Sequence, residues 1–355
     1  MKENVIVAMS GGVDSSTTAA LLKEQGYEVS GITMQLWDYA DEETGCCSLS
    51  DVFDARQAAN QIGIKHTVVN YKKDFQNYVV SDFIDKYYNG LTPNPCIMCN
   101  EYMKFNFLLN KALDLGADYL ATGHYAKISQ DEGGKYFLEK GVDKFKDQSY
   151  FLFSLKQKEL SRLMFPLGAF SKSQVREISQ GFELTVASKK ESQDVCFIAK
   201  DYRTFIEKNF KGRKPKIGNI KSVDGEILGQ HSGIQNFTIG QRKKLGVSNN
   251  KPLYVVSINY KNGDVLVGDD TDLYSSDLIA TNLNWSINPE ELANNKLKAK
   301  IRYRSPESLA KINFIEDKVS VHFDQPQRAI TPGQAIVFYD DNKVVGGGWI
   351  DEVRE

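Results

Sequence analysis

The sequence predicts an α/β fold: an N-terminal doubly wound domain built on a parallel sheet, a small β-rich central domain and a C-terminal β-barrel. Two observations predict it. Strand and helix patterns alternate through the first half of the chain, and after about Lys200 they give way to short β-like runs separated by turns. A length of 355 residues suits two or three domains, which we place at residues 1–203, 204–273 and 274–355.

Apolar runs and helical periodicities alternate in the first half. Strands are expected at Val5–Met9, Glu28–Leu36, His66–Asn70 and Asp118–Thr122, and helices at Asp14–Gln25, Asp51–Gln61, Asp74–Tyr88 and Asn100–Leu115. Gly26 and Gly63 follow the first two helices, where glycine commonly ends a helix. Strands joined by helices pair in parallel, and the helices cover both faces of the sheet. The Gly-, Lys- and Asp-rich segment Asp131–Asp147 is expected to be a hairpin that extends from this domain.

The second half begins with one helix and continues as strands. The helix is expected at Asp201–Phe210, and the strands at Val255–Asn259, Asp264–Val267, Lys298–Arg304, Val319–Phe323 and Ala335–Tyr339. Turn sequences occur at Asp224-Gly225, Asn262-Gly263 and Asp340-Asp341-Asn342. We expect the central domain to end near Asp272 and the barrel to follow it.

The composition is that of a globular protein. With 41% apolar and 25% charged residues, the chain is neither disordered throughout nor fibrous. No apolar run reaches the roughly 18 to 20 residues that cross a bilayer. The chain enters a strand pattern at once, without a signal or transit segment. We therefore expect a soluble, cytoplasmic protein.

The charges are balanced overall but segregated along the chain. With 44 basic and 46 acidic residues the net charge is −2, which excludes a protein that simply coats nucleic acid. The segment from Glu207 to Lys251, however, holds ten basic and only three acidic residues. The basic ones are Lys208, Lys211, Arg213, Lys214, Lys216, Lys221, Arg242, Lys243, Lys244 and Lys251. This segment is suited to phosphate contacts, and a solvated basic face is the alternative.

The most specific signal is Ser10-Gly11-Gly12-Val13-Asp14-Ser15-Ser16, between the first strand and the first helix. Glycines at such a junction let backbone N–H groups approach an anion, and the helix adds the positive end of its dipole. The serine hydroxyls can donate to phosphate oxygens, and Asp14 can help to hold Mg²⁺. The alternative is a tight turn with a helix cap. Neither G-x-x-x-x-G-K-S/T nor a G-x-G-x-x-G after a strand occurs, so neither a P-loop NTPase nor a dinucleotide site is favoured.

Five cysteines in a chain without a secretion signal argue against a framework of structural disulfides. Cys96 and Cys99 follow two prolines, and Cys99 is expected near a helix N-terminus, where the helix dipole lowers the pKa of a thiol. Cys196 follows the polar run Ser192-Gln193-Asp194. Four roles are open: a structural zinc site, simple packing of Cys196, a redox pair of Cys99 and Cys196, and ligation of a [4Fe–4S] cluster by Cys96, Cys99 and Cys196.

Several further motifs follow the Ser10–Ser15 loop along the chain. They are Asn94-Pro95-x-x-x-Cys99-Asn100, Gly123-His124-Tyr125, Asp147-Gln148-Ser149-Tyr150, the run from Ser192 to Phe197, the run from Gly240 to Lys243, Arg302-Tyr303-Arg304 and Pro332-Gly333-Gln334. The loop resembles the pyrophosphate loop of the ATP pyrophosphatase (PP-loop) superfamily. Together, in this order, the motifs resemble those of the tRNA-specific 2-thiouridylases. An unrelated ATP pyrophosphatase would share only the first motif.

This resemblance implies an ATP-dependent replacement of the 2-oxygen of the wobble uridine of tRNA by sulfur. ATP and Mg²⁺ would be held by the loop while the uridine O2 attacks the α-phosphorus and releases pyrophosphate. Cys196 would then carry sulfur as a persulfide, and Cys99 would release it toward C2, closing a disulfide with Cys196 as AMP departs. A donor protein, such as a cysteine desulfurase or a sulfur-relay protein, would supply the sulfur.

The resemblance also implies three groups of binding residues. Ala8, Met9, Ser10, Gly11, Gly12, Val13, Asp14, Ser15, Met34 and Gly123 would bind ATP, and Asn94, Pro95 and Cys96 would line the target base. His124, Lys146, Asp147, Gln148, Arg302, Tyr303 and Gln334 would contact tRNA, to which the basic segment adds Lys243 and Lys244. Cys96 departs from the family, because many members have Asp there. Its presence completes a three-cysteine set like that of cluster-dependent tRNA thiolation enzymes.

Two other functions are consistent with parts of the sequence. An ATP pyrophosphatase that forms an amide on a small molecule explains the loop, but leaves the three cysteines and the basic segment unused. A non-catalytic tRNA-binding protein would hold a structural metal and would not consume ATP.

Overall fold

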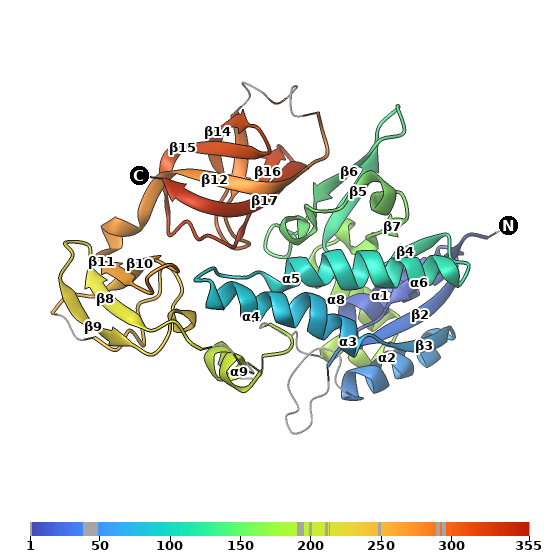
Figure 1. Cartoon of the computed structure of the whole chain (residues 1–355). Coiled ribbons are helices and arrows are strands. Elements are labelled where there is room, and N and C mark those ends of the chain that lie inside the picture. The colour runs from blue at the N-terminus through green and yellow to red at the C-terminus, as the bar shows by residue number, and fades with distance from the viewer. Residues whose placement is uncertain are drawn as a thin grey trace. The chain divides into compact units, whose positions relative to one another are not determined.

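The computed structural model describes residues 2–37, 49–189, 195–198, 201–209, 212, 214–247, 250–288, 292 and 296–354. By its internal contacts the chain forms two compact units (Figure 1). The first contains Met1–Val79, Cys96–Ala199 and Asn342–Val344, and the second contains Val80–Pro95, Lys200–Asp341 and Val345–Glu355. Within the described residues, no helix is both long and apolar enough to cross a membrane.

A five-stranded parallel sheet forms the centre of the first unit. Its strands are β1 (Asn4–Ala8), β2 (Glu28–Gln35), β3 (Lys65–Asn70), β4 (Tyr119–Ala121) and β7 (Leu163–Met164), in the order β3-β2-β1-β4-β7. Ile6 of β1 lies opposite Ser30 of β2 on one side and Leu120 of β4 on the other. The chain therefore winds outward in both directions from β1, as in a doubly wound sheet.

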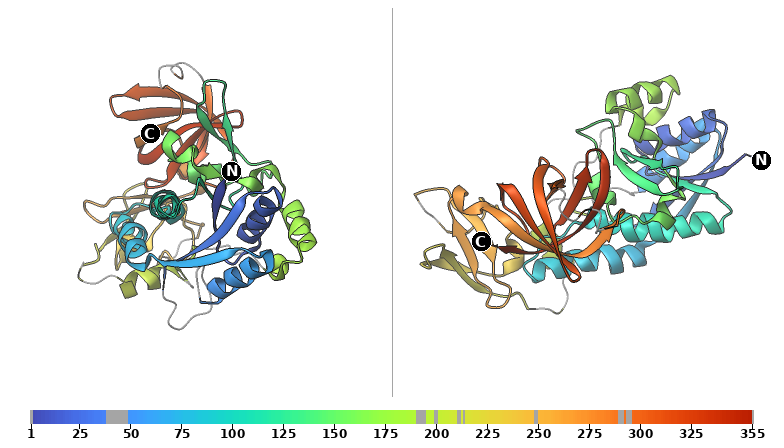
Figure 2. Two further views of the ribbon diagram at one scale, coloured as in Figure 1. Left: turned by 90° about the vertical axis from the view of Figure 1, so that its right-hand side faces the viewer. Right: turned by 90° about the horizontal axis from the view of Figure 1, so that it is seen from above.

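Helices cover both faces of this sheet. They are α1 (Val13–Glu24), α2 (Leu49–Ile62), α3 (Lys72–Phe75), the π-helix η1 (Gln76–Val80), α5 (Pro95–Met98), the π-helix η2 (Cys99–Leu108), α6 (Leu109–Asp114), α7 (Gln157–Leu160) and α8 (Lys172–Gly181). In the left panel of Figure 2, α1 and α2 lie on one side of the sheet and the helix from Cys99 to Asp114 lies on the other. Ala19 and Leu22 of α1 pack with Ala55 and Ala59 of α2 against Val7. The alanines allow both helices to approach the sheet closely.

Shorter elements complete the first unit. A hairpin of β5 (Ala126–Gln130) and β6 (Tyr136–Lys140) follows β4, and 3₁₀ turns lie at η3 (Ser149–Leu152), η4 (Pro166–Ala169) and η5 (Thr185–Ser188). The expected hairpin is confirmed, although its strands begin before Asp131 and the residues from Gly141 to Gln148 form a turn of their own.

The second unit contains a small mixed sheet. Its strands are β8 (Gly218–Ser222), β9 (Ile227–His231), β10 (Tyr254–Ile258) and β11 (Val265–Gly268), in the order β10-β11-β8-β9, with the 3₁₀ turn η6 (Ile234–Asn236) beside them. Ile220, Phe237, Val255 and Val267 belong to its buried core. The helices α4 (Ser81–Tyr88) and α9 (Tyr202–Asn209) contact each other through stacked tyrosines, Tyr87 and Tyr202, whose ring centroids lie 4.6 Å apart.

Six further strands of the second unit close into a barrel. After the 3₁₀ turn η7 (Asp270–Leu273) they are β12 (Tyr274–Trp285), β13 (Lys296–Lys300), β14 (Ser308–Ile315), β15 (Lys318–Arg328), β16 (Ala335–Asp340) and β17 (Lys343–Arg354). They follow the order β12-β15-β14-β13-β16-β17, and a pairing of β17 with β12 closes the circle. Phe323, Phe338 and Ile350 fill the interior. The predicted fold class is thus confirmed.

Three local predictions need correction. The strand expected to reach Arg304 ends at Lys300, because Arg302 and Ser305 form a turn in which Ser305 N–H donates to the Arg302 carbonyl. The strands β7, β8, β9, β12, β14 and β17 and the helices α7 and α8 were not predicted from the sequence patterns. The helix that carries Cys99 begins at Pro95, one turn before the expected start, because proline is well suited to the first helical position.

Candidate functional site

The Ser10–Ser16 loop, which we call the phosphate loop, lies at the switch point of the parallel sheet. It joins the carboxyl end of β1 to α1, and the carboxyl ends of β2 and β4 flank it. Met9 extends the pairing with β2, since its N–H donates to the Ile32 carbonyl at 2.8 Å. The crevice outside the carboxyl ends of strands at such a switch point is where open α/β sheets bind their ligands.

The conformation of the phosphate loop depends on its glycines and serines. Gly11 has φ +70°, and a Cβ there would lie 2.2 Å from the Asp51 carbonyl oxygen of α2, so only glycine fits. Ser15 Oγ accepts the N–H of Ser10 at 3.1 Å and donates to the Gly12 carbonyl at 3.3 Å. Gly12 is the N-cap of α1 and makes no side-chain capping hydrogen bond. The N-terminus of α1 therefore lacks a side-chain cap, and such a helix end can bind an anion.

The other predicted ATP-binding residues lie at different distances along the chain from this loop. Gly123 follows β4, and a Cβ there would lie 2.9 Å from the carbonyl carbon of Asp14, so this glycine permits close packing on the first turn of α1. Ala8 ends β1, Val13 begins α1, and both Met9 and Met34 are buried. The structure thus brings the phosphate loop and Gly123 together, whereas Met34 lies within the sheet core.

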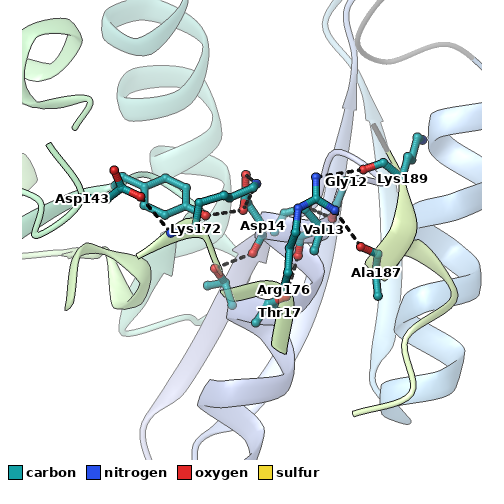
Figure 3. Close-up of polar contacts among 12 residues, drawn as sticks. Gly12, Val13, Asp14, Thr17, Asp143, Lys172, Arg176, Ala187 and Lys189 are labelled. Carbon is teal, nitrogen blue, oxygen red and sulfur yellow. Dashed lines mark hydrogen bonds and ion pairs between the residues drawn. The ribbon is translucent and has the colours of Figure 1, made fainter. Parts of the chain in front are cut away.

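Asp14 is held by Lys172, which the sequence analysis missed, and by Tyr125, which it named only as part of the Gly123-His124-Tyr125 motif. Lys172, the first residue of α8, places its Nζ 2.8 and 2.9 Å from the two carboxylate oxygens of Asp14, and Tyr125 donates its hydroxyl to Asp14 Oδ1 at 2.7 Å (Figure 3). Ser171 and Gln174 form a capping box that starts α8 at this point. A carboxylate and a lysine at the mouth of the phosphate loop suit the binding of a magnesium–phosphate group.

Lys189, directly after η5, joins the phosphate loop to α2. Its Nζ donates to the Gly11 carbonyl at 3.1 Å and forms ion pairs with Asp51, at 2.8 Å, and Asp54. Burial alone would lower the pKa of Lys189, but hydrogen bonds to the two carboxylates outweigh it and raise this pKa. Arg176 holds the neighbouring backbone through the Ala187 carbonyl at 2.9 Å (Figure 3). No short motif includes Lys172 or Lys189, so only their contacts reveal them.

The three candidate cysteines lie in the first unit at different depths. Cys96 is exposed in α5, whereas Cys99, at the start of η2, and Cys196 are partly buried. Because the helix begins at Pro95, Cys96 and not Cys99 occupies its first turn, where the dipole acts most strongly. Cys99 lies near the helix N-terminus, as expected, but one turn further along the helix than Cys96.

Cys196 is positioned by its neighbour Phe197. The Phe197 ring is buried and contacts Phe75, with centroids 5.5 Å apart, and Trp37, at 6.3 Å. This aromatic cluster anchors a turn in which the Ile198 N–H donates to the Val195 carbonyl. Ser192, Gln193 and Asp194, together with Cys46 and Cys47, to which the sequence analysis assigns no role, lie outside the described residues.

An iron–sulfur cluster and Mg²⁺ need different sets of protein ligands. Among the described residues, no three His, Cys, Asp or Glu side chains are gathered closely enough to hold a metal ion. Cys96, Cys99 and Cys196, which are all described, are therefore not gathered into such a group in this structure. Mg²⁺ needs fewer protein ligands, because it is commonly bound by one or two carboxylates together with substrate phosphates. Asp14 fits that requirement.

The predicted tRNA residues of the first unit are partly internal. His124 is only 7% exposed, lies between the rings of Phe105 and Phe165, and contacts Thr122 Oγ1 at 2.6 Å. Asp147 is also buried. Because both side chains are buried, we do not expect them to contact RNA directly.

Burial, and secondly the charge of Lys104, hold the pKa of His124 well below its usual 6.5. Below about pH 6.5 the unfolded chain therefore takes up a proton that folded His124 does not, so stability falls by as much as about 1.4 kcal/mol per pH unit. We expect wild type to lose more stability than His124→Gln between about pH 7.5 and pH 5.5 in urea unfolding. The lowered pKa values of His66 and His231 affect both proteins alike. Equal losses would show that His124 is not the group responsible.

In the second unit, Gln334 holds the segment that leads to the predicted base site. Its side-chain amide donates to the carbonyls of Thr92, at 3.0 Å, and Pro93, at 2.9 Å. Asn94 and Pro95, which follow, are both buried. Gln334 thus positions the residues before Cys96.

The basic residues of the second unit are mostly exposed. Lys243 and Lys244 lie on the surface, and Lys244 Nζ forms an ion pair with Asp201 at 2.7 Å. Arg302 donates to the Arg328 carbonyl, and Lys300 Nζ lies 5.8 Å from the centre of the Tyr303 ring. Of the other basic residues, Lys211 and Arg213 lie outside the described residues.

Three family sequence models match consecutive parts of this chain. The one described as "tRNA methyl transferase HUP domain" matches residues 3–200, and "tRNA methyl transferase PRC-barrel domain" matches residues 203–269. "Aminomethyltransferase beta-barrel domain" matches residues 275–350. They correspond to the parallel sheet, the small mixed sheet and the closed barrel.

Full-length relatives match the whole chain. The "tRNA-specific 2-thiouridylase MnmA" of Geotalea uraniireducens is 48% identical over 359 aligned residues, covering 99% of this chain and 95% of that protein. The "tRNA-specific 2-thiouridylase MnmA 1" of Thermoanaerobacter sp. (strain X514) is 51% identical over 362, covering 99% of each. The solved "U34-tRNA thiolase NcsA from Methanococcus maripaludis with its [4Fe-4S] cluster" is 20% identical, with a TM-score of 0.36, over 58% of this chain and 65% of that one. This last likeness is too distant to transfer any residue role.

Proposed function

The chain belongs to the tRNA-specific 2-thiouridylase family, and from this membership we propose that it replaces the 2-oxygen of the wobble uridine of tRNA by sulfur, using ATP. It is an ATP-using tRNA sulfurtransferase. The main support for an ATP site in this chain is the phosphate loop at the switch point of the sheet. The N-terminus of α1, which has no side-chain cap, follows this loop, and Asp14 lies in its first turn.

The first step is adenylation of the base. The phosphate loop and the N-terminus of α1 hold the phosphates of ATP, and Asp14 helps to hold Mg²⁺, which would neutralise phosphate charge. Lys172, already in contact with Asp14, adds a positive charge beside them. The uridine O2 attacks the α-phosphorus and pyrophosphate leaves. The O2 atom, a poor leaving group in uridine, then leaves readily as part of AMP.

The second step transfers sulfur. A persulfide on Cys196 attacks C2 through its terminal sulfur, and AMP departs. The Cys99 thiolate then attacks the Cys196 sulfur, breaks the S–S bond to the transferred sulfur and leaves a Cys99–Cys196 disulfide, which a dithiol reductant reopens. We assign no step to an iron–sulfur cluster. Asn94, Pro95 and Cys96 line the base pocket in this proposal.

The proposal also names partners and a compartment. The tRNA phosphates are bound by the basic surface of the second unit, including Lys243, Lys244 and Arg302. A sulfur-donor protein loads Cys196, and the reaction takes place in the cytoplasm. We also propose that the chain divides into domains at residues 1–203, 204–273 and 274–355.

The function is tested with the purified chain, ATP, Mg²⁺, a persulfide source, a dithiol reductant and a tRNA transcript with U34. We expect pyrophosphate release that depends on the tRNA, and 2-thiouridine at position 34 by nucleoside mass spectrometry. A matched transcript with C34 should support neither. Pyrophosphate release that needs no RNA would instead indicate a small-molecule substrate.

Neutralising Lys243 and Lys244 together should weaken tRNA binding and reduce its salt dependence. If each contacts one phosphate, the slope of log K against log salt becomes shallower by about 2 in the double alanine variant. Filter binding over a range of salt concentrations measures both quantities. Lys318→Ala is the control, because this exposed lysine of β15 pairs only modestly with Asp351, at 3.3 Å. An unchanged affinity and slope would remove this pair of lysines from the interface.

A further inference from the structure

The turn from Asp143 to Asp147, which we call the Phe145 turn, presents an unusually exposed aromatic ring. Phe145 is 94% exposed, the highest value among the large apolar side chains that are exposed in the described part of the chain. Lys144 before it is exposed as well, and Lys146 after it is partly exposed. A phenylalanine so fully in water gains nothing from packing within its own fold.

The backbone of the Phe145 turn is held firmly. Asp143 Oδ1 accepts the N–H groups of Phe145, at 3.0 Å, and Lys146, at 3.2 Å, and the Asp143 carbonyl accepts the N–H of Asp147 at 2.8 Å. The buried Asp147 carboxylate accepts the N–H groups of Gly141, at 3.0 Å, and Ser149, at 3.2 Å. The exposed ring therefore stands on an ordered support and loses little backbone entropy on binding.

Two series of contacts join this turn to the phosphate loop. Asp143 Oδ2 accepts the backbone N–H of Lys172 at 2.9 Å, and Lys172 Nζ holds Asp14 (Figure 3). On the other side, Gln148 exchanges hydrogen bonds with the backbone of Tyr125, at 2.9 and 3.0 Å, and the Tyr125 hydroxyl donates to Asp14. The Phe145 turn is thus built onto the same residues that hold the candidate magnesium ligand.

We propose that Phe145 is a stacking platform for an unpaired base of the tRNA anticodon loop, with Lys144 and Lys146 binding the flanking phosphates. An aromatic ring between cations is the combination that binds single-stranded nucleic acid, because every base offers a π-face and every nucleotide a phosphate. Asp147 and Gln148 then support the turn instead of contacting RNA directly. This inference rests on the proposed function, and it adds a residue that orients the tRNA beside the ATP site.

The surroundings of the ring favour RNA over a protein partner. A protein docking site usually joins its aromatic anchor to further apolar side chains in a well-packed centre. Here the ring is bordered in sequence by two lysines, and the other exposed large apolar side chain of this segment, Val142, is much less exposed, at 55%.

The test compares Phe145→Ala, Phe145→Trp and the double variant Lys144→Ala/Lys146→Ala by equilibrium binding of an anticodon stem-loop with U34 to the full chain. Loss of one stacked base should weaken binding by roughly 5- to 100-fold in Phe145→Ala, with an unchanged salt slope. Phe145→Trp should bind like wild type, since stacking is retained. The lysine variant should instead make the salt slope shallower by about 2. Leu115→Ala, which removes another exposed apolar side chain of the first unit (53% exposed), should change nothing.

The outcomes separate this inference from the proposed function. Wild-type affinity in Phe145→Ala, while wild type binds and thiolates tRNA, overturns the stacking role alone. Absence of binding and thiolation in wild type would instead overturn the proposed function. Normal tRNA affinity in Phe145→Ala, combined with slower sulfur loading of Cys196 by a donor protein, would assign the ring to protein docking and also overturn the inference.

Discussion

Replacing Gly11 with alanine should reduce tRNA-dependent pyrophosphate release by about 100-fold or more, because an ångström-scale displacement of a site costs that much. The added Cβ would lie 2.2 Å from the Asp51 carbonyl oxygen, and φ of +70° is unfavourable for alanine. Asp51 cannot easily give way, because Lys189 binds both its carboxylate and the Gly11 carbonyl. The phosphate loop must therefore move. Initial rates of pyrophosphate release, with ATP affinity from equilibrium binding, measure the effect.

Two matched glycine variants separate ligand binding from folding. Gly26→Ala, at φ +96° with no atom within 4 Å of the new Cβ, should cost about 1 kcal/mol of stability and leave pyrophosphate release unchanged. Gly12→Ala has an extended backbone with φ −101° and meets only Ser10 Oγ, at 3.5 Å, so the chain can accommodate it. A loss of ATP affinity in Gly12→Ala would then indicate that the added methyl group occupies space that the phosphates need. Normal pyrophosphate release by Gly11→Ala would show that ATP binds elsewhere.

Replacing Cys196 with serine should leave tRNA-dependent pyrophosphate release intact and reduce 2-thiouridine below detection. Adenylation uses the phosphate loop, whereas sulfur transfer needs the Cys196 thiol as its carrier, and a serine hydroxyl cannot form a persulfide. The expected result is a separation of the two half-reactions. Pyrophosphate assays and nucleoside mass spectrometry on the same reaction measure it.

The neighbouring cysteines serve as controls for this separation. Cys99→Ser should still load a persulfide on Cys196 but stay joined to the tRNA through a Cys196–S–S–C2 link, without releasing thiouridine. Cys96→Ser should keep most of its activity. Wild-type thiolation by Cys196→Ser would exclude Cys196 as the carrier. A different result would be that anaerobically purified protein contains iron and acid-labile sulfide, both lost in Cys96→Ser. That result would contradict the persulfide route and indicate a [4Fe–4S] cluster on Cys96, Cys99 and Cys196.

Local sequence was enough for the features whose cause is local. The phosphate loop could be predicted because its two glycines and its serines stand between a strand and a helix. The structure shows the positive φ and close packing at Gly11 and the helix end without a side-chain cap at Gly12 that explain them. The predicted strands and helices of the first half agree with the structure within a few residues. The reason is that β-branched runs and helical periodicity reflect which side chains are buried in a strand or a helix. Motif order along the chain indicated the family.

Only the tertiary structure decided which residues complete the site. Lys172 reaches Asp14 across 158 positions and Lys189 reaches Gly11 across 178, so no window of sequence contains either contact. The burial of His124 and Asp147, the closure of the barrel by β12 and β17, and the exposure of Phe145 depend in the same way on distant segments packing together. A residue type states what chemistry a side chain can perform. Its neighbours in space determine whether that side chain supports the fold or is free to meet a ligand.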